Sequence, residues 1–141
     1  MAIICRLSST VCLFLFLSAE FLSLSLGDVG NAAHYDPPYI PTACYGSDVS
    51  QFPTSNMFGA AGERAWDNGA SCGRQYLVRC ISAALPTTCF PDKSIQIRIV
   101  DRALTSVSRP SVPGTTIVLS IAAFSAIANL SASSVNIEFQ Q

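Results

Sequence analysis

The chain has 141 residues, half of them hydrophobic, and its 8 Lys and Arg nearly balance its 9 Asp and Glu to give a formal net charge of −1. This balance argues against nucleic acid as the main partner, because phosphate binding requires a concentrated positive surface. The length fits one domain with a modest core rather than two.

Residues 1–27 have the pattern of a secretory signal peptide. Arg6 is their one basic residue, residues 11–17 are almost entirely apolar, and Ser25 and Gly27 are small residues suited to cleavage. A signal anchor is the alternative, but Glu20 and the serines interrupt the segment short of the ~20 apolar residues that span a bilayer. We expect a secreted, extracellular domain over residues 28–141, monomeric and without a membrane span.

The mature segment keeps an even number of cysteines, Cys44, Cys72, Cys80 and Cys89. In an oxidising compartment this number predicts two disulfides, with three connectivities open. A zinc site is the competing interpretation, but there is no C-x-x-C pair and the single histidine, His34, lies ten residues before the first of these cysteines. We expect no metal and no cofactor, and we interpret His34 as an exposed residue of an N-terminal strand.

Next in chain order, residues 35–41 carry three prolines in five positions, so this segment is extended or turned and not helical. Residues 44–64 are rich in Gly, Ser, Pro and Asn with scattered aromatics, which predicts a long surface loop held by a few buried rings. Asn68-Gly69 then supplies a turn, and an apolar run from Tyr76 to Cys80 predicts a strand.

The C-terminal half has the pattern of further strands. Residues 94–101 and 135–139 alternate apolar and polar side chains, and residues 115–119 form a β-branched run. Ser120 is a suitable N-cap for a short helix over residues 121–128. Residues 102–114, rich in Ser and Pro, predict an exposed connection. The pattern indicates an all-β fold with one short helix.

Five segments occur together in an order that is specific: Cys44-Tyr45-Gly46, Trp66-Asp67-Asn68-Gly69, Cys72-Gly73, Val78-Arg79-Cys80 and Ile99-Val100-Asp101. With them, residues 28–141 resemble the expansin-like domain related to family-45 endoglucanases. Within that group the chain is most similar to the plant natriuretic peptide and blight-associated protein type, which shares the Tyr35–Tyr39 segment and the Arg74–Cys80 strand.

The resemblance implies a six-stranded double-psi β-barrel, whose closed sheet leaves no exposed edge. It also implies that Cys44 pairs with Cys72 and Cys80 with Cys89. Expansins place a further cysteine where this chain has Ala103, so a third bridge is not expected.

A more important departure from the expansin pattern concerns the catalytic acid. Expansins carry a His-Phe-Asp-Leu-Ser motif whose aspartate matches the general acid of the related endoglucanases, and here residues 116–120 align with it, with Val118 at the acid position. Valine has no proton to donate, and inverting glycoside hydrolysis requires two carboxyl groups. We therefore expect no enzymatic activity.

Asp101 is the leading candidate site residue, since it ends a strand and precedes Arg102, as in the Asp-Arg-Gly stretch of bacterial rare lipoprotein A. Its alternative role is structural, through backbone hydrogen bonds or pairing with Arg102. Asp36 is the second candidate, although Asp before Pro-Pro is also ordinary turn chemistry. Four aromatic residues offer faces on which sugar rings could stack, with burial in the core as the alternative: Tyr35, Tyr39, Tyr45 and Trp66.

Asn129-Leu130-Ser131 is an N-glycosylation sequon just after the predicted helix, where we expect exposure. For function, the resemblance implies a secreted apoplastic protein that acts without catalysis on water and solute balance or stress responses, through a cell-surface receptor. The alternative is a cell-wall polysaccharide-binding or wall-loosening module without hydrolytic activity. A residual hydrolase is the least favoured hypothesis.

Overall fold

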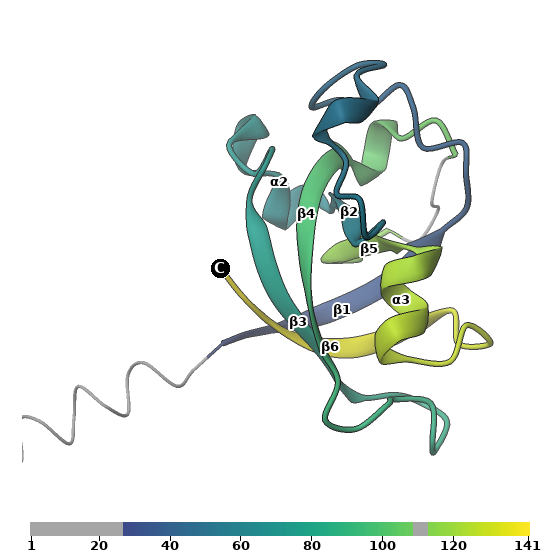
Figure 1. Cartoon of the computed structure of the whole chain (residues 1–141). Helices are drawn as coiled ribbons and strands as arrows, with labels where there is room; N and C mark the ends of the chain where they lie inside the picture. The colour runs from purple at the N-terminus through teal and green to yellow at the C-terminus, as the bar shows by residue number, and fades with distance from the viewer. Residues whose placement is uncertain (1–26, 109–112) are drawn as a thin grey trace, which may run out of the picture.

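The computed structural model describes residues 27–108 and 113–141, so the predicted signal peptide lies outside the described residues except for Gly27 (Figure 1). Within them the chain forms six strands and two short α-helices, besides three 3-10 turns at Val49–Gln51, Asp67–Gly69 and Ala103–Thr105. The strands are β1 (Asp28–Tyr35), β2 (Phe58–Ala61), β3 (Gln75–Ser82), β4 (Ser94–Arg102), β5 (Ile117–Ser120) and β6 (Ser134–Gln140); the helices are α2 (Glu63–Trp66) and α3 (Ile121–Ile127). None of the described helices is long and apolar enough to cross a membrane.

The six strands close into a barrel in the order β1-β5-β2-β4-β3-β6. The pairs β1–β5 and β2–β4 are parallel and the other four are antiparallel. Closure satisfies the backbone groups that an open sheet would leave unpaired at its edges. The predicted six-stranded barrel is thereby confirmed.

The barrel interior is filled by alternate residues of the strands and by α3. On β3 the side chains of Tyr76, Val78 and Cys80 are buried, whereas the residues between them are exposed. Phe124 and Ile127 of α3 are fully buried in the same cluster. The helix begins where the sequence predicts, because the Ser120 hydroxyl accepts a hydrogen bond of 3.2 Å from the Ala123 amide.

A second apolar cluster lies on the outer face of β1, β2, β4 and β5. On β5, Ile117 and Leu119 point into the barrel, so Val118 between them points outward. Residues 36–57, which we call the covering segment, lie over this face, and Tyr39, Tyr45 and Phe52 from it pack against the cluster. The clustered residues are Ala33, Tyr35, Phe58, Ala60, Val100 and Val118.

Three expectations from the sequence were incomplete or wrong. Strand β2 lies inside the predicted loop 44–64; it is four residues long and mostly Gly and Ala, so it lacks the β-branched pattern of a strand. Helix α2 follows it, so the structure has two short helices rather than one. His34 is half-buried, not exposed, because its ring packs 4.7 Å from that of Phe124 and its Nε2 lies 3.1 Å from the Ala132 carbonyl oxygen.

Two disulfides fix loops to the barrel. Cys44–Cys72 ties the covering segment to the turn before β3, and Cys80–Cys89 closes the hairpin between β3 and β4. These are the pairs that the resemblance implies, whereas the spacing of the cysteines left three connectivities open. The Asn68-Gly69 turn adopts positive φ angles of 52° and 93° at these two residues, which is the backbone freedom expected of Asn and Gly.

We predict that removing Cys44–Cys72 destabilises the protein more than removing Cys80–Cys89. The cysteines of the two pairs lie 28 and 9 residues apart, respectively, and the entropy model gives losses of about 3.5 kcal/mol for the longer loop and about 2.5 kcal/mol for the shorter one. Denaturant unfolding of the two double Cys→Ala variants measures both values. Equal losses, or the reverse order, would show that contacts of the hairpin outweigh the loop entropy.

Candidate functional site

Asp101 lies near the end of β4 at the edge of the outer apolar cluster, and its side chain has no solvent exposure. Its Oδ1 accepts two backbone hydrogen bonds of 2.8 Å, one from the Ala43 amide and one from the Arg102 amide. Its Oδ2 is buried and has no hydrogen-bond partner among the described residues. The carboxyl group therefore joins the covering segment to the barrel through one of its two oxygens.

Burial raises the pKa of Asp101 above its ordinary value of 3.8, and the hydrogen bonds from the Ala43 and Arg102 amides counteract part of that rise. Tyr35 is equally buried, with 3% of its surface exposed and no hydrogen-bond partner for its hydroxyl among the described residues. Burial, and then the charge of Asp101, raise the pKa of Tyr35. Asp101 and Tyr35 thus lie within electrostatic reach of each other.

The interpretation of Asp101 as a partner of the Arg102 guanidinium is wrong. That guanidinium instead makes two hydrogen bonds with the Glu63 carboxylate, of 3.0 and 2.9 Å, and its central carbon lies 5.7 Å from the centre of the Trp66 ring. Only the backbone amide of Arg102 contacts Asp101. Trp66 is half-buried and lies beneath the Arg102 guanidinium.

The four aromatic candidates do not form one surface. Tyr35 and Tyr39 pack edge to face at 4.9 Å, and Tyr39 meets Phe58 at 4.8 Å, so these rings contact each other. The Tyr39 hydroxyl donates a 3.0 Å hydrogen bond to the Tyr35 carbonyl oxygen. Tyr45 packs against the same cluster, whereas Trp66 packs against the barrel core at α2.

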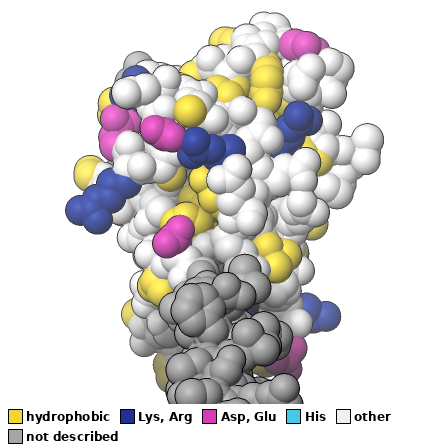
Figure 2. Space-filling view, turned by 90° about the vertical axis from the view of Figure 1, so that its left-hand side faces the viewer, with side chains coloured by type: hydrophobic (Ala, Val, Ile, Leu, Met, Phe, Trp, Pro, Cys, Tyr) yellow, Lys and Arg dark blue, Asp and Glu magenta, His cyan; other side chains and the backbone are white. Residues whose placement is uncertain are grey.

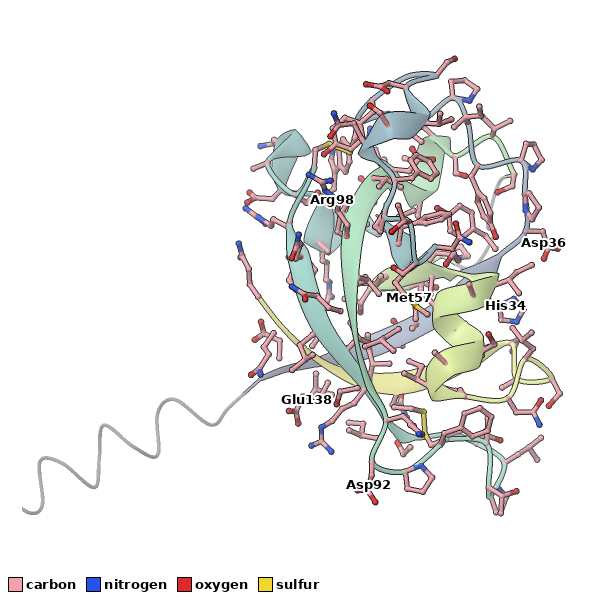
Figure 3. The ribbon with its side chains drawn as sticks, viewed as in Figure 1. His34, Asp36, Met57, Asp92, Arg98 and Glu138 are labelled. Atoms are coloured by element: carbon pink, nitrogen blue, oxygen red, sulfur yellow. A yellow bond between two sulfur atoms is a disulfide. The ribbon has the colours of Figure 1, made fainter. Side chains whose placement is uncertain are left out.

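Asp36 follows β1 and is exposed on the covering segment, as Figure 3 shows. It faces no described basic group closely enough for an ion pair. Burial raises the pKa of Tyr39, and the Asp36 charge adds a smaller contribution in the same direction. Asp36 is therefore accessible to a partner, whereas the carboxyl group of Asp101 is buried.

A pocket of about 410 Å³ lies beside α2 and was not found by reasoning from the sequence. Its residues come from segments far apart in the chain, so no local motif signals it. Arg74 makes a 2.6 Å ion pair with Asp67, while Arg64 has no ion pair among the described residues. The lining includes Asp28, Arg64, Asp67, Arg74, Tyr76 and Phe139.

Figure 2 shows the face of the molecule on which α2 and the C-terminus lie, with basic, acidic and apolar side chains interspersed. This mixture fits a neutral polar ligand better than a polyanion. Across residues 27–108 and 113–141, no group of three or more His, Cys, Asp and Glu side chains is arranged to hold a metal ion.

Comparison with known proteins places this geometry in a family. Residues 59–139 match a family model described as lytic transglycolase. An EG45-like domain containing protein of Citrus jambhiri is 36% identical over 94% of this chain and 92% of its own length. EG45-like domain containing protein 2 of Arabidopsis thaliana is 34% identical over 78% of this chain and 77% of its own length.

Solved structures agree on the fold. A mutant expansin of Clavibacter michiganensis in complex with cellohexaose superposes with a TM-score of 0.59 at 19% identity, over 82% of this chain and 50% of that chain. The apo expansin of the same organism gives a TM-score of 0.56 at 18% identity. The chain thus spans about half the length of these expansins. From its relatives and its barrel, the chain belongs to the family of EG45-like domain proteins, with the expansin-like double-psi β-barrel fold.

Proposed function

We propose that this chain is a secreted apoplastic protein that acts without catalysis on water and solute balance, by binding a cell-surface partner. The observation that carries the proposal is the position of Val118, which is 2% exposed and packed in the outer apolar cluster. This is the position that aligns with the general acid of the related endoglucanases. The proposal extends to this chain what its resemblance to the plant natriuretic peptide type implies.

Hydrolysis by the inherited route has no support in this geometry. Inverting glycosidases place two carboxyl groups roughly 6.5–9.5 Å apart, with a water between the base and the sugar. Here two methyl groups occupy the acid position, and Asp101 has no solvent exposure. Because Asp101 binds the amide of Ala43, next to the Cys44–Cys72 bridge, its carboxyl group serves to anchor the covering segment.

The covering segment offers a surface for a protein partner. Ile40 and Val49 on this segment are exposed apolar residues, and Asp36 provides an exposed charge. The disulfide at Cys44 and the two hydrogen bonds of Asp101 hold the segment in place. A fixed loop loses little conformational entropy on binding, which favours recognition.

We expect the purified mature domain to change the volume of plant protoplasts at micromolar concentration, since the proposed partner is on the cell surface. The double variant Val49→Ser/Ile40→Ser, altered only on the exposed face of the covering segment, is expected to lose most of this effect. The matched control is Leu85→Ser, an exposed apolar residue of the β3–β4 hairpin. Unchanged protoplast volume with the wild-type domain would contradict the proposal.

A structural role for Asp101 predicts a specific pH dependence. Because its folded-state pKa is raised, protonated Asp101 stabilises the fold fully below its ordinary pKa of 3.8, and this contribution is lost as pH rises through the raised value. We expect the free energy of unfolding of Asp101→Asn, relative to wild type, to increase as the pH rises above about 4 and to level off once the pH exceeds the raised pKa of Asp101. Denaturant titrations at each pH measure the difference.

Two comparisons sharpen this test. Asp101→Ala leaves the Ala43 and Arg102 amides without their acceptor, so we expect it to cost about 1–3 kcal/mol at low pH, where Asp101 is protonated, and less as the pH rises through the raised pKa of Asp101. Asp101→Asn retains one oxygen acceptor and should preserve the effect on protoplasts. A folded Asp101→Asn variant that is inactive on protoplasts, together with sugar ends released by the wild type alone, would show a catalytic Asp101.

A second candidate function is binding of cell-wall polysaccharide without cleavage. The neighbouring expansin structure contains cellohexaose, and the observation in this chain that favours the idea is the pocket beside α2. Its wall includes Tyr76 and Phe139, whose rings meet at 5.5 Å, and the half-buried Trp66 lies between two lining residues, Ala65 and Asp67. Aromatic surface beside polar groups is typical of sugar-binding sites.

For this candidate, we expect the mature domain to be retained on cellulose, xylan or pectin at low salt, and Trp66→Ala or Arg64→Ala to lower retention several-fold. Lys93→Ala is the matched control, because Lys93 is an exposed cation next to Asp92 at the far end of the barrel (Figure 3). Pull-down of each purified variant measures the bound fraction. Absence of retention on all three polymers would rule out the polysaccharide function and leave the first proposal intact.

A further inference from the structure

The loop between α3 and β6 presents Asn129 to solvent. The backbone amide of Asn129 donates a 2.9 Å hydrogen bond to the Thr88 carbonyl oxygen, which holds this residue against the β3–β4 hairpin. Its side-chain Oδ1 accepts a 3.0 Å hydrogen bond from the Ser131 amide. Its Nδ2 makes no hydrogen bond with the described residues. Asn129 is an exposed residue, and its Nδ2 is not engaged in holding the fold.

Asn129 is also the one asparagine of the sequence with a hydroxyl residue two positions later. The other asparagines, at positions 31, 56, 68 and 136, are followed at that place by Ala, Phe, Ala and Glu. The residue between Asn129 and Ser131 is Leu130, not proline, so the acceptor sequence N-x-S is complete. A single position in the chain thus combines the sequence requirement with exposure.

We propose that Asn129 carries an N-linked oligosaccharide, an inference that depends on the secretion contained in the proposed function. In the transfer, Asn129 Nδ2 forms a bond with the anomeric carbon of a lipid-diphosphate-linked oligosaccharide. The bond from that carbon to the diphosphate oxygen breaks, the lipid diphosphate leaves, and the amide proton passes to a base of the transferase. The finished glycan extends from the α3–β6 loop into solvent.

The glycan has an apolar surface to cover. Leu130 is exposed beside its attachment point, and Phe90, whose amide donates a 2.8 Å hydrogen bond to the Ile127 carbonyl oxygen, is exposed on the hairpin held against this loop. Leu85 and Ile81 add further exposed apolar area on the same hairpin. Figure 1 shows this hairpin and the covering segment at opposite ends of the barrel. A glycan at Asn129 shields the first end and leaves the second free for a partner.

The test is expression of the full chain in plant cells, with the intact mass of the protein in the medium measured before and after peptide N-glycosidase. We expect the wild type to lose the mass of one oligosaccharide and to carry Asp in place of Asn129. Asn129→Gln and Ser131→Ala should show no such loss, whereas Ser131→Thr and Asn136→Gln should behave as wild type. Asn136 is the matched control because it is exposed and outside any sequon.

The outcomes separate this inference from the proposed function. Protein in the medium with unmodified Asn129 overturns the glycan and leaves secretion standing; retention inside the cell without a glycan contradicts both. Shielding is measured on the secreted proteins by sedimentation. Asn129→Gln is expected to self-associate at lower concentration than wild type, and the added change Leu130→Ser to reverse this. Equal self-association of Asn129→Gln and wild type overturns the shielding.

Discussion

The outer face of this barrel depends on two hydrogen bonds to one oxygen of Asp101. Oδ1 receives the amide of Ala43 from the covering segment and the amide of Arg102 from its own strand, so a single carboxyl oxygen connects the two. One residue further on, the Cys44–Cys72 bridge ties the same segment to the turn before β3. These attachments keep Tyr39, Tyr45 and Phe52 over the apolar face of the sheet. Without them Val100 and Val118 would be exposed to water, at a cost of roughly 1.5–3 kcal/mol for each fully buried side chain of this size.

The same arrangement explains why a valine suits position 118. A carboxyl group there would be surrounded by Phe58, Val100 and the ring of Tyr35, and a second buried charge near Asp101 would raise the pKa values of both acids. Val118 instead adds apolar area to the cluster. Asp101 bears the desolvation cost of its own carboxyl group, which its two amide donors partly offset. The outer face of the barrel is thus a packed apolar interface with one buried carboxyl group at its edge.

Much of the fold was predictable, because its longer strands have one polar face. The sequence predicted the alternation of apolar and polar side chains in β3, β4 and β6, and it predicted the N-cap at Ser120. Strand β2 was not, for a steric reason: a Cβ on Gly59 would come within 2.7 Å of the Val118 carbonyl oxygen, and one on Gly62 within 1.9 Å of the Thr115 carbonyl oxygen. Such close approach demands glycine, which also weakens any strand pattern. The pocket beside α2 could likewise not be predicted from the sequence, since closure of the barrel brings its lining residues together from distant segments.

The candidate site shows a related limit. A carboxylate at a strand end is a reasonable catalytic candidate from sequence, and its burial and raised pKa also fit that role. What distinguishes a catalytic from a structural role is the surroundings of each carboxyl oxygen of Asp101, which the sequence does not give. Oδ1 is fully used by backbone amides, and Oδ2 lies among buried groups near Tyr35, not at a surface that a sugar reaches. Because neither oxygen of Asp101 is accessible, its raised pKa reflects the desolvation of a carboxyl group that anchors a loop. The functional surface of this barrel is therefore to be sought in the exposed side chains that the anchored segment presents, and in the pocket beside α2, rather than at the carboxyl group that organises them.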